Sequence, residues 1–160
     1  MRRLAAEYGG DTIWSSMYAA HDALSDNMQR MLSDLIATHD TGRAFAVAAY
    51  RNERSSGENS LRMVSAEHPV VLVHPETGRK ALYVNFHFTS GIKGMKPAES
   101  APLLRFLFAH IETPDFTCRF RWRPNSIAMW DNRCTQHSAL ADNLSANRHM
   151  ERVAVLASRA

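Results

Sequence analysis

Trp130–His137 reads W-D-N-R-C-T-Q-H, and this stretch is more informative about the chain than any other. It extends an apolar run, Ser126–Trp130, into a polar loop that a histidine closes. Two arginines, Arg148 and Arg152, follow 11 and 15 positions after His137. A neutral imidazole can bind a metal ion, and guanidinium groups are suited to carboxylates and sulfonates. The string therefore predicts a metal ligand followed by two anion-binding cations, where a lone His would indicate only a solvated loop.

The complete pattern resembles the TauD/TfdA family of Fe(II)- and 2-oxoglutarate-dependent dioxygenases. W-D-N-R-x-T-Q-H is the most specific part of the resemblance, and three other stretches agree with it in the family's order: Gly9–Thr12 (G-G-D-T), His68–Val71 with His74–Arg79, and Asn85 with Phe88 and Thr89. The resemblance runs from about Gly9 to about Leu156. The branch that acts on sulfonates and alkyl sulfates looks most similar.

Periodicity and turn residues indicate several strands and few helices. The expected strands are Val70–Val73, Ala81–Val84, Phe116–Trp122, Ser126–Trp130 and Glu151–Leu156. One helix is expected after an N-cap at Ser25, and a second over Pro97–Glu112. Polar residues 51–67 are expected to form a mobile loop. The chain is thus expected to be one domain, 1–160, mainly β with helical insertions. It would form half of a double-stranded β-helix (jelly roll), incomplete in this chain.

Composition and charge exclude some classes of function. The chain is 45% hydrophobic and 22% charged, and its net charge of +3 is spread along the sequence, which argues against nucleic-acid binding. Arg119, Arg121 and Arg123 alternate with Phe120 and Trp122, but a strand with Phe116, Cys118, Phe120 and Trp122 inward and the arginines outward explains them more simply. No run approaches 18 apolar residues, so we expect a cytoplasmic protein without membrane contact.

An iron site of this kind needs two His and one carboxylate on one face of the metal. In the family, the first His and the acid form an H-x-D/E pair well before G-G-D-T. Only Met1–Tyr8 precede Gly9 here, and none of them is His. His110 and Glu112 spell H-x-E, but on a helix they point in different directions. His149-Met150-Glu151 also spells it, at a position where the family has no ligand.

The resemblance implies a role for each of six site residues. His137 would be an iron ligand, Arg148 and Thr12 would bind the 2-oxoglutarate carboxylate, Arg152 would hold the sulfonate or sulfate, and Phe88 and Phe45 would line the substrate pocket. Asp131 and Asn132 are expected to shape the turn before His137. The implied reaction consumes O2 and hydroxylates the carbon beside the sulfur or oxygen, so that sulfite or sulfate and an aldehyde are released.

Two alternatives remain at this point. The chain could be a non-catalytic truncated remnant of the family that binds no iron, or a module that binds an anionic ligand without redox chemistry. Half a jelly roll leaves edges and an apolar face uncovered, so we expect upstream residues or a second copy to complete it, and a homo-oligomer.

Overall fold

The computed structural model describes residues 2–4, 9–43, 64–140 and 149–155. The strands are β1 Arg2–Leu4, β2 Thr12–Ser16, β3 Ile36–Asp40, β4 Ser65–Pro69, β5 Val71–Val73, β6 Lys80–Leu82, β7 Thr89–Ile92, β8 Thr117–Phe120, β9 Thr135–Ala139 and β10 His149–Met150. The helices are α1 Met17–Asp22, α2 Asp26–Ser33, α4 Pro97–Ile111 and the 3-10 turn η1 Pro114–Phe116. This is the expected class, mainly β with helical insertions.

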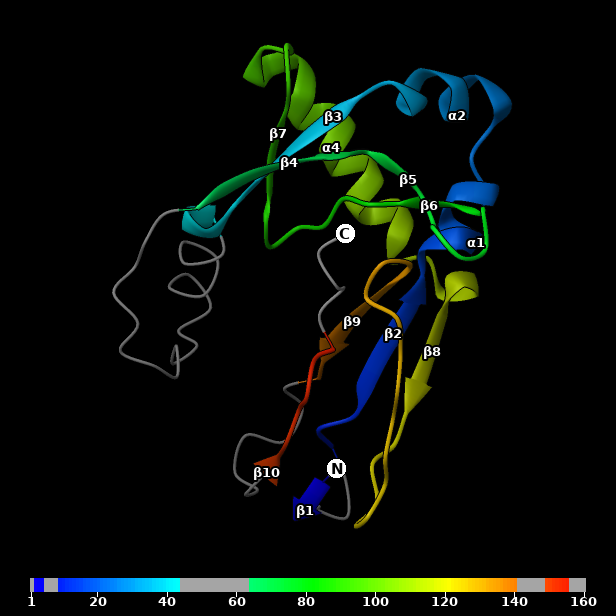
Figure 1. The fold of residues 1–160 in the computed structure, drawn as a ribbon, viewed down its shortest axis with the longest axis vertical. Coiled ribbons are helices and arrows are strands. Elements are labelled where there is room, and N and C mark those ends of the chain that lie inside the picture. Colours follow the sequence, from blue (N-terminus) through cyan, green and yellow to red (C-terminus); the bar gives the residue numbers. More distant parts are fainter. Residues whose placement is uncertain (1, 5–8, 44–63, 141–148, 156–160) are drawn as a thin grey trace.

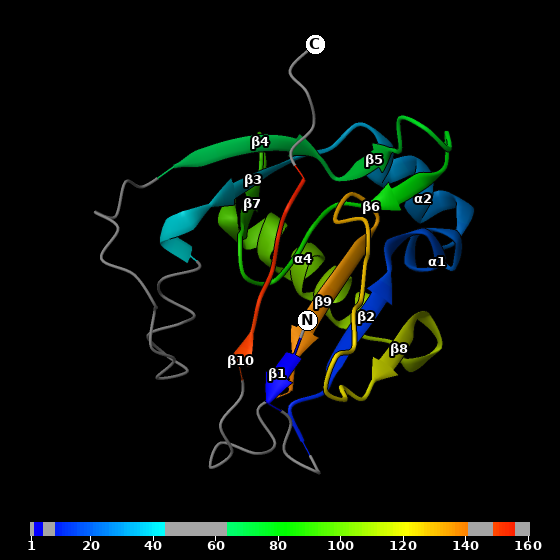
Figure 2. The same ribbon diagram turned by 60° about the horizontal axis from the view of Figure 1, so that its bottom comes forward.

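The strands form four small antiparallel sheets. The orders are β8-β2-β9, β4-β3-β7, β5-β6 and β1-β10. Figure 1 shows the β8-β2-β9 sheet in the lower part of the molecule, with α1, α2, α4 and the β4-β3-β7 sheet above it. Figure 2 shows the first strand, β1, beside the last, β10. Each of these sheets has only two or three strands in the part of the chain that the structure describes, as expected of an incomplete jelly roll.

The hydrophobic core lies where α1, α2 and α4 meet β3, β5, β6 and β7. Leu104, Leu107 and Ile111 of α4 are all buried, and their spacing places them on one face of the helix. Met17 of α1 and Leu32 of α2 are almost fully buried in the same cluster. The helices therefore stabilise the fold by burying apolar side chains against these strands.

Local signals set the element boundaries as expected. The Ser25 side chain accepts a hydrogen bond from the Met28 N–H and begins α2. Pro97 occupies the first turn of α4, where its missing N–H costs nothing. The β5-β6 hairpin turns at Gly78, whose φ of +67° favours glycine. Both predicted helices and this hairpin are thus confirmed.

Two predicted strands are wrong. Residues 126–130 and 151–155 have no regular structure. A strand needs a neighbour that accepts and donates its backbone hydrogen bonds, and none of the strands in the described ranges pairs with either segment. Their alternating apolar side chains are correct for strands but face solvent. The exposed fractions are 77% for Ile127, 96% for Met129, 91% for Val153 and 95% for Val155.

Other expectations need smaller corrections. Ser65–Pro69 forms β4, so the expected loop ends earlier than residue 67, and residues 51–63 lie outside the described part of the chain. The side of β8 predicted to face inward is buried only in part: Trp122, just after the strand, is buried, but Cys118 and Phe120 are exposed. Arg119 points to the other face and forms an ion pair with Asp11 at 2.7 Å.

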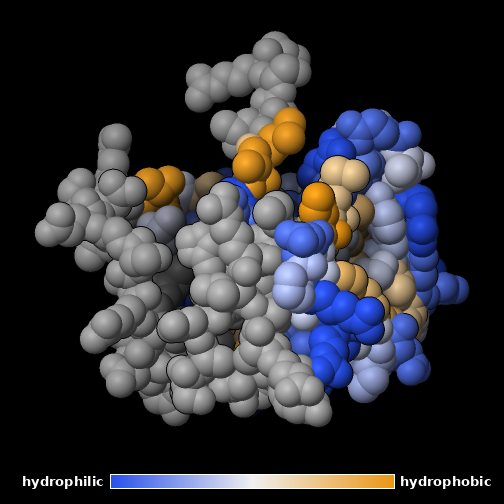
Figure 3. Space-filling model, turned by 90° about the horizontal axis from the view of Figure 1, so that it is seen from below, coloured by the Kyte–Doolittle hydropathy of each residue, from blue (hydrophilic) through white to orange (hydrophobic). Residues whose placement is uncertain are grey.

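Figure 3 shows hydrophobic side chains beside strongly hydrophilic ones on the face seen from below. Within the described ranges, none of the helices has the length and apolar character needed to cross a bilayer.

Candidate functional site

His137 lies in the middle of β9, at the edge of the β8-β2-β9 sheet. It is directly opposite Trp14 of β2, while Ala139 is opposite Thr12. Residues that face each other across an antiparallel pair project from the same side of the sheet. His137, Trp14 and Thr12 therefore share one face, and Thr12 is a diagonal neighbour of His137 at about 7–8 Å between Cα atoms.

An aromatic cluster surrounds His137 on this face. The ring of Trp130 lies 4.9 Å from the imidazole, centroid to centroid, and 5.3 Å from Trp14. Trp14 also contacts Phe120 at 5.9 Å and Trp122 at 6.1 Å. The sequence analysis did not assign this cluster. Part of its signal was present, because Phe120 and Trp122 are two positions apart and were expected to face inward.

The aromatic wall and a nearby cation act on His137 in the same direction. Desolvation by the surrounding residues lowers the pKa of His137, and the positive charge of Arg152 lowers it further. Arg152 is exposed and lies in the segment after β10. Both effects favour the neutral imidazole, which is the form that binds a metal ion. Arg152 is therefore near enough for its charge to act on His137.

Thr12 is buried at the start of β2, and its hydroxyl oxygen accepts a hydrogen bond from Trp122 Nε1 at 2.9 Å. A hydroxyl can accept and also donate. The indole N–H takes one lone pair, which leaves the Thr12 proton able to reach an acceptor. This arrangement suits a hydroxyl that donates to a carboxylate.

The remaining predicted site residues are placed less completely. Phe88 is 45% exposed in the turn before β7, and the Asn85 side chain caps this turn by accepting from the Phe88 N–H at 2.8 Å. Asp40 of β3 donates its N–H to the Phe88 carbonyl at 2.8 Å, so the turn is tied to the sheet. Phe45 and Arg148 lie outside the described residues.

The loop that precedes His137 is held by charged side chains. Asp131 Oδ1 accepts from the Arg133 N–H at 2.8 Å, which confirms that Asp131 shapes the turn. The Arg133 guanidinium also binds this carboxylate and holds the pKa of Asp131 well below its usual range. His74 Nε2 lies 3.1 Å from the other carboxylate oxygen, and Glu76 binds Arg133 at 2.8 Å. His74 belongs to a quoted motif, but the sequence analysis gave it no role.

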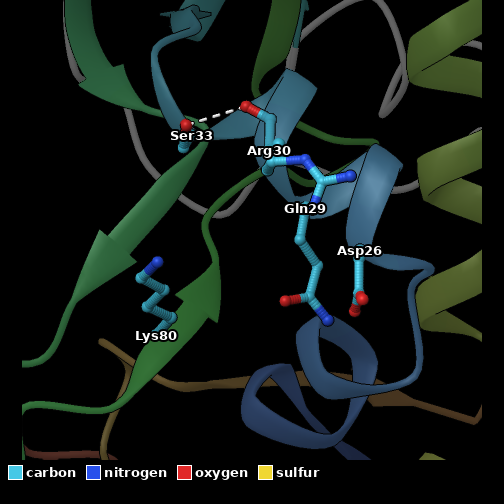
Figure 4. Close-up of a pocket in the computed structure, with 5 residues that line it drawn as sticks. All are labelled: Asp26, Gln29, Arg30, Ser33 and Lys80. Atoms are coloured by element: carbon cyan, nitrogen blue, oxygen red, sulfur yellow. Dashed lines mark hydrogen bonds between the residues drawn. The ribbon is translucent and has the colours of Figure 1, made fainter.

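A separate recess of about 200 Å³ lies between α2 and β6 (Figure 4). It is lined by Asp26, Gln29, Arg30, Ser33 and Lys80. Two of the lining side chains bind backbone carbonyls: Ser33 Oγ donates to the Arg30 carbonyl at 2.8 Å, and Gln29 Nε2 donates to the Leu24 carbonyl at 2.9 Å. None of them is a predicted site residue.

Comparison with known proteins identifies the family. The model of the taurine catabolism dioxygenase TauD, TfdA family matches residues 1–154. The chain belongs to this family. An alpha-ketoglutarate-dependent dioxygenase of Penicillium expansum, cnsM, is 41% identical over 155 residues, which are 94% of this chain and 42% of that protein. An alpha-ketoglutarate-dependent sulfate ester dioxygenase of Pseudomonas putida is 34% identical and is covered over 51% of its length, against 94% of this chain.

A solved relative supports the same assignment. The crystal structure of a taurine dioxygenase from Burkholderia xenovorans superposes with a TM-score of 0.76 at 36% identity, over 92% of this chain and 47% of that chain. The TauD/TfdA chain described here thus spans about half the length of the relatives it matches. This agrees with the open sheets and the uncovered apolar segments.

Proposed function

We propose that this TauD/TfdA chain carries part of the active site of an Fe(II)- and 2-oxoglutarate-dependent dioxygenase. The substrate would be a small sulfonate or alkyl sulfate, hydroxylated with O2 at the carbon next to sulfur or oxygen. The products would be an aldehyde with sulfite or sulfate, together with succinate and CO2. One observation carries the proposal: His137 and Thr12 share one face of the β8-β2-β9 sheet, although they are far apart in sequence. The charge of Arg152 also acts on His137.

The donor atoms present fit one third of an iron site. His137 offers one imidazole, whereas a facial site needs a second His and a carboxylate. Among the described residues, the grouped metal-ligand types are His74, Asp131 and Cys134, and His137 is not one of them. We infer that the other two ligands come from outside these 160 residues, where the family has its H-x-D pair. The side chains of Met129 and Val155 support this inference, because both are apolar and exposed, and exposed apolar surface is typical of an interface with another segment or chain.

Each residue then has a distinct task. Arg148 would pair with the distal carboxylate of 2-oxoglutarate, and Thr12 would donate its hydroxyl proton to that group. Arg152 would bind the sulfonate or sulfate, for which a guanidinium offers several donors in fixed geometry. Phe88, and Phe45 by family resemblance, would line the substrate pocket. O2 would be the oxidant, activated at the bound iron with electrons from 2-oxoglutarate, and the residues of this chain would orient the substrate and exclude water.

The test compares the 160-residue chain with a version extended by the family's upstream half. Succinate formation with Fe(II) and 2-oxoglutarate should require the extended version. In that version, His137→Ala should abolish both tight Fe(II) binding and turnover. His110→Ala is the matched histidine control and should retain both, because His110 of α4 contacts the Ala20 carbonyl of α1 at 2.7 Å.

Turnover by the 160-residue chain alone would show that its own residues complete the iron site. An extended version that folds but binds no iron would support the alternative, a non-catalytic remnant. We further propose that the enzyme is homo-oligomeric and cytoplasmic, with no nucleic-acid or membrane partner. Measuring the molecular mass of the extended version at several concentrations would test the oligomeric state.

A further inference from the structure

Four side chains link the β5-β6 hairpin to the loop before β9. His74 is 4% exposed and begins the hairpin turn, and its Nε2 meets Asp131 Oδ2 at 3.1 Å. Arg133 bridges the same two segments, with Nε 2.9 Å from Asp131 Oδ1 and a terminal nitrogen 2.9 Å from Glu76 Oε1. We call His74, Glu76, Asp131 and Arg133 the clamp.

The hydrogen-bond directions fix which nitrogen of His74 carries the proton. Nδ1 accepts from the backbone N–H groups of Glu76 and Thr77, both at 3.3 Å. A nitrogen that accepts from two donors holds a lone pair, so the proton sits on Nε2 and is donated to Asp131. A longer contact of 3.4 Å joins Nδ1 to Glu76 Oε2, but that carboxylate already binds Arg133 at shorter distances.

This tautomer decides between a metal site and a hydrogen-bonded clamp. Ligand atoms of His74, Asp131 and Cys134 lie within 4.8 Å of one another, which by itself would suit a metal ion. His74 Nε2 carries a proton and so has no free lone pair for a metal, and Arg133 neutralises the charge of the Asp131 carboxylate. The group therefore acts through hydrogen bonds.

The clamp ends where the strand of His137 begins. The Asp131 carbonyl accepts from the Cys134 N–H at 3.3 Å, and the Cys134 carbonyl accepts from the Met17 N–H at 2.9 Å. β9 then starts at Thr135. Among the described strands, β9 pairs only with β2, so one of its edges lacks a ladder that would hold it. Strand edges of this kind open locally unless another contact restrains them.

We propose that His74 is a positioning residue for His137. By donating Nε2–H to Asp131, it fixes the turn from which β9 starts and so keeps the His137 imidazole on the face of Trp14 and Thr12. The proposal rests on the proposed function only in assigning His137 to the iron. Its physical content, that His74 holds β9 in place, concerns the chain without metal.

Two substitutions separate the two roles of the His74 ring. In His74→Asn, the amide oxygen occupies roughly the place of Nδ1, so it can still accept from Glu76 and Thr77 but cannot reach Asp131. In His74→Gln, the amide nitrogen lies near the place of Nε2 and can still donate to Asp131. A residue that only caps the hairpin turn would be replaced better by Asn, and a residue that holds Asp131 would be replaced better by Gln.

Amide hydrogen exchange of the 160-residue chain, without iron, measures how firmly β9 is held in each variant. In His74→Asn, exchange over β9 should quicken at least about tenfold, the size expected for loss of a hydrogen bond to a charged group. Exchange over β8, the opposite edge of the same sheet, should stay within about twofold and serves as the internal control. His74→Gln should leave β9 within about twofold of wild type. Faster exchange in Gln than in Asn, or equal quickening of β8 and β9, would overturn the proposal.

Nitrogen NMR of the wild-type chain provides a test that no unfolded variant can obscure. The His74 imidazole should show its proton on Nε2, and a proton on Nδ1 would overturn the proposal.

Titration with Co(II) should produce no thiolate charge-transfer band, whereas such a band would assign Cys134 and His74 to a metal. In the extended version, His74→Asn should lower kcat and Fe(II) affinity with little change in the KM for 2-oxoglutarate. If the extended wild-type version shows no turnover but the hydrogen-exchange results are as expected, the proposed function is contradicted and the positioning role of His74 is not.

Discussion

His137 faces Trp14 across the β2-β9 pair, and Trp130 covers the imidazole from the loop at a centroid distance of 4.9 Å. The candidate ligand is therefore seated against an aromatic wall contributed by distant parts of the chain. Such a wall keeps water from one side of the ring and favours its neutral form. The same wall depends on a hydrogen bond from Trp122 to Thr12, which leads to the first prediction.

Thr12→Val should lower the free energy of unfolding by about 1–3 kcal/mol, because the buried Trp122 N–H loses its acceptor. Thr12→Ser keeps a hydroxyl at this position and should lose less. Urea unfolding followed by tryptophan fluorescence measures both. Equal stability of the Val and Ser variants would show that the hydrogen bond contributes nothing to the fold.

Arg148 and Arg152 should separate by function in the extended version. Arg148→Ala should raise the KM for 2-oxoglutarate about tenfold or more, because a charge-assisted hydrogen bond contributes about 1.5–3 kcal/mol. Arg152→Ala should raise the KM for the sulfonate or sulfate and leave uncoupled 2-oxoglutarate decay comparatively intact. Steady-state kinetics with both substrates gives the answer. If both variants affect only 2-oxoglutarate, Arg152 has another role.

Acid should destabilise the chain through His39 of β3. Desolvation lowers the pKa of His39, the charge of His68 lowers it further, and a backbone hydrogen bond to Tyr83 acts in the opposite direction. The unfolded chain then binds more protons than the folded chain between the lowered pKa and the unfolded value of about 6.5. The stability that His39 contributes is complete above about pH 6.5 and is lost as the pH falls through the folded pKa.

Melting temperatures measured from about pH 8 to pH 5 test this expectation. His39→Asn keeps a donor near Nδ1 but does not titrate, so its melting temperature should fall less steeply with acid than that of wild type. An unchanged slope would mean that His39 takes up no proton on unfolding.

The exposed apolar segments make a prediction about association. Met129→Ser and Val155→Ser together should not lower the melting temperature of the 160-residue chain, since these side chains are 96% and 95% exposed. The double variant should bind less of the dye ANS and self-associate less. Val84→Ser, which changes a fully buried side chain, is the contrasting control and should destabilise. Unchanged dye binding by the double variant would place the apolar surface elsewhere.

The fold class could be predicted because local signals and a long motif determine it, whereas His137, expected to close a polar loop, lies in the middle of β9. Ser25 caps α2 through its own hydroxyl, and Gly78 sets the hairpin turn, so each works within a few residues. Thr12, His137 and Arg152 could be named only through the family's motif. No periodicity shows that residues distant in sequence share a sheet face.

The failed strand predictions have a different cause. Ile127, Met129, Val153 and Val155 alternate as strand residues do, but an alternating pattern specifies which face is apolar and not whether a partner strand is present. The clamp escaped prediction because His74 and Asp131 lie 57 positions apart and act as a pair only after folding. Asp131 was assigned correctly to its turn, since that bond spans two residues.

The pairing of β2 has a consequence for the order in which the protein is made. Thr12 pairs with Phe120 and with Ala139, so β2 leaves the ribosome long before either partner strand is synthesised. At about 5–20 residues per second, the wait is on the order of ten seconds, against microseconds for a local hairpin such as β5-β6. The hairpin that carries His74 is thus ready first. The strand that bears the candidate ligand joins later, onto elements that precede it in the sequence.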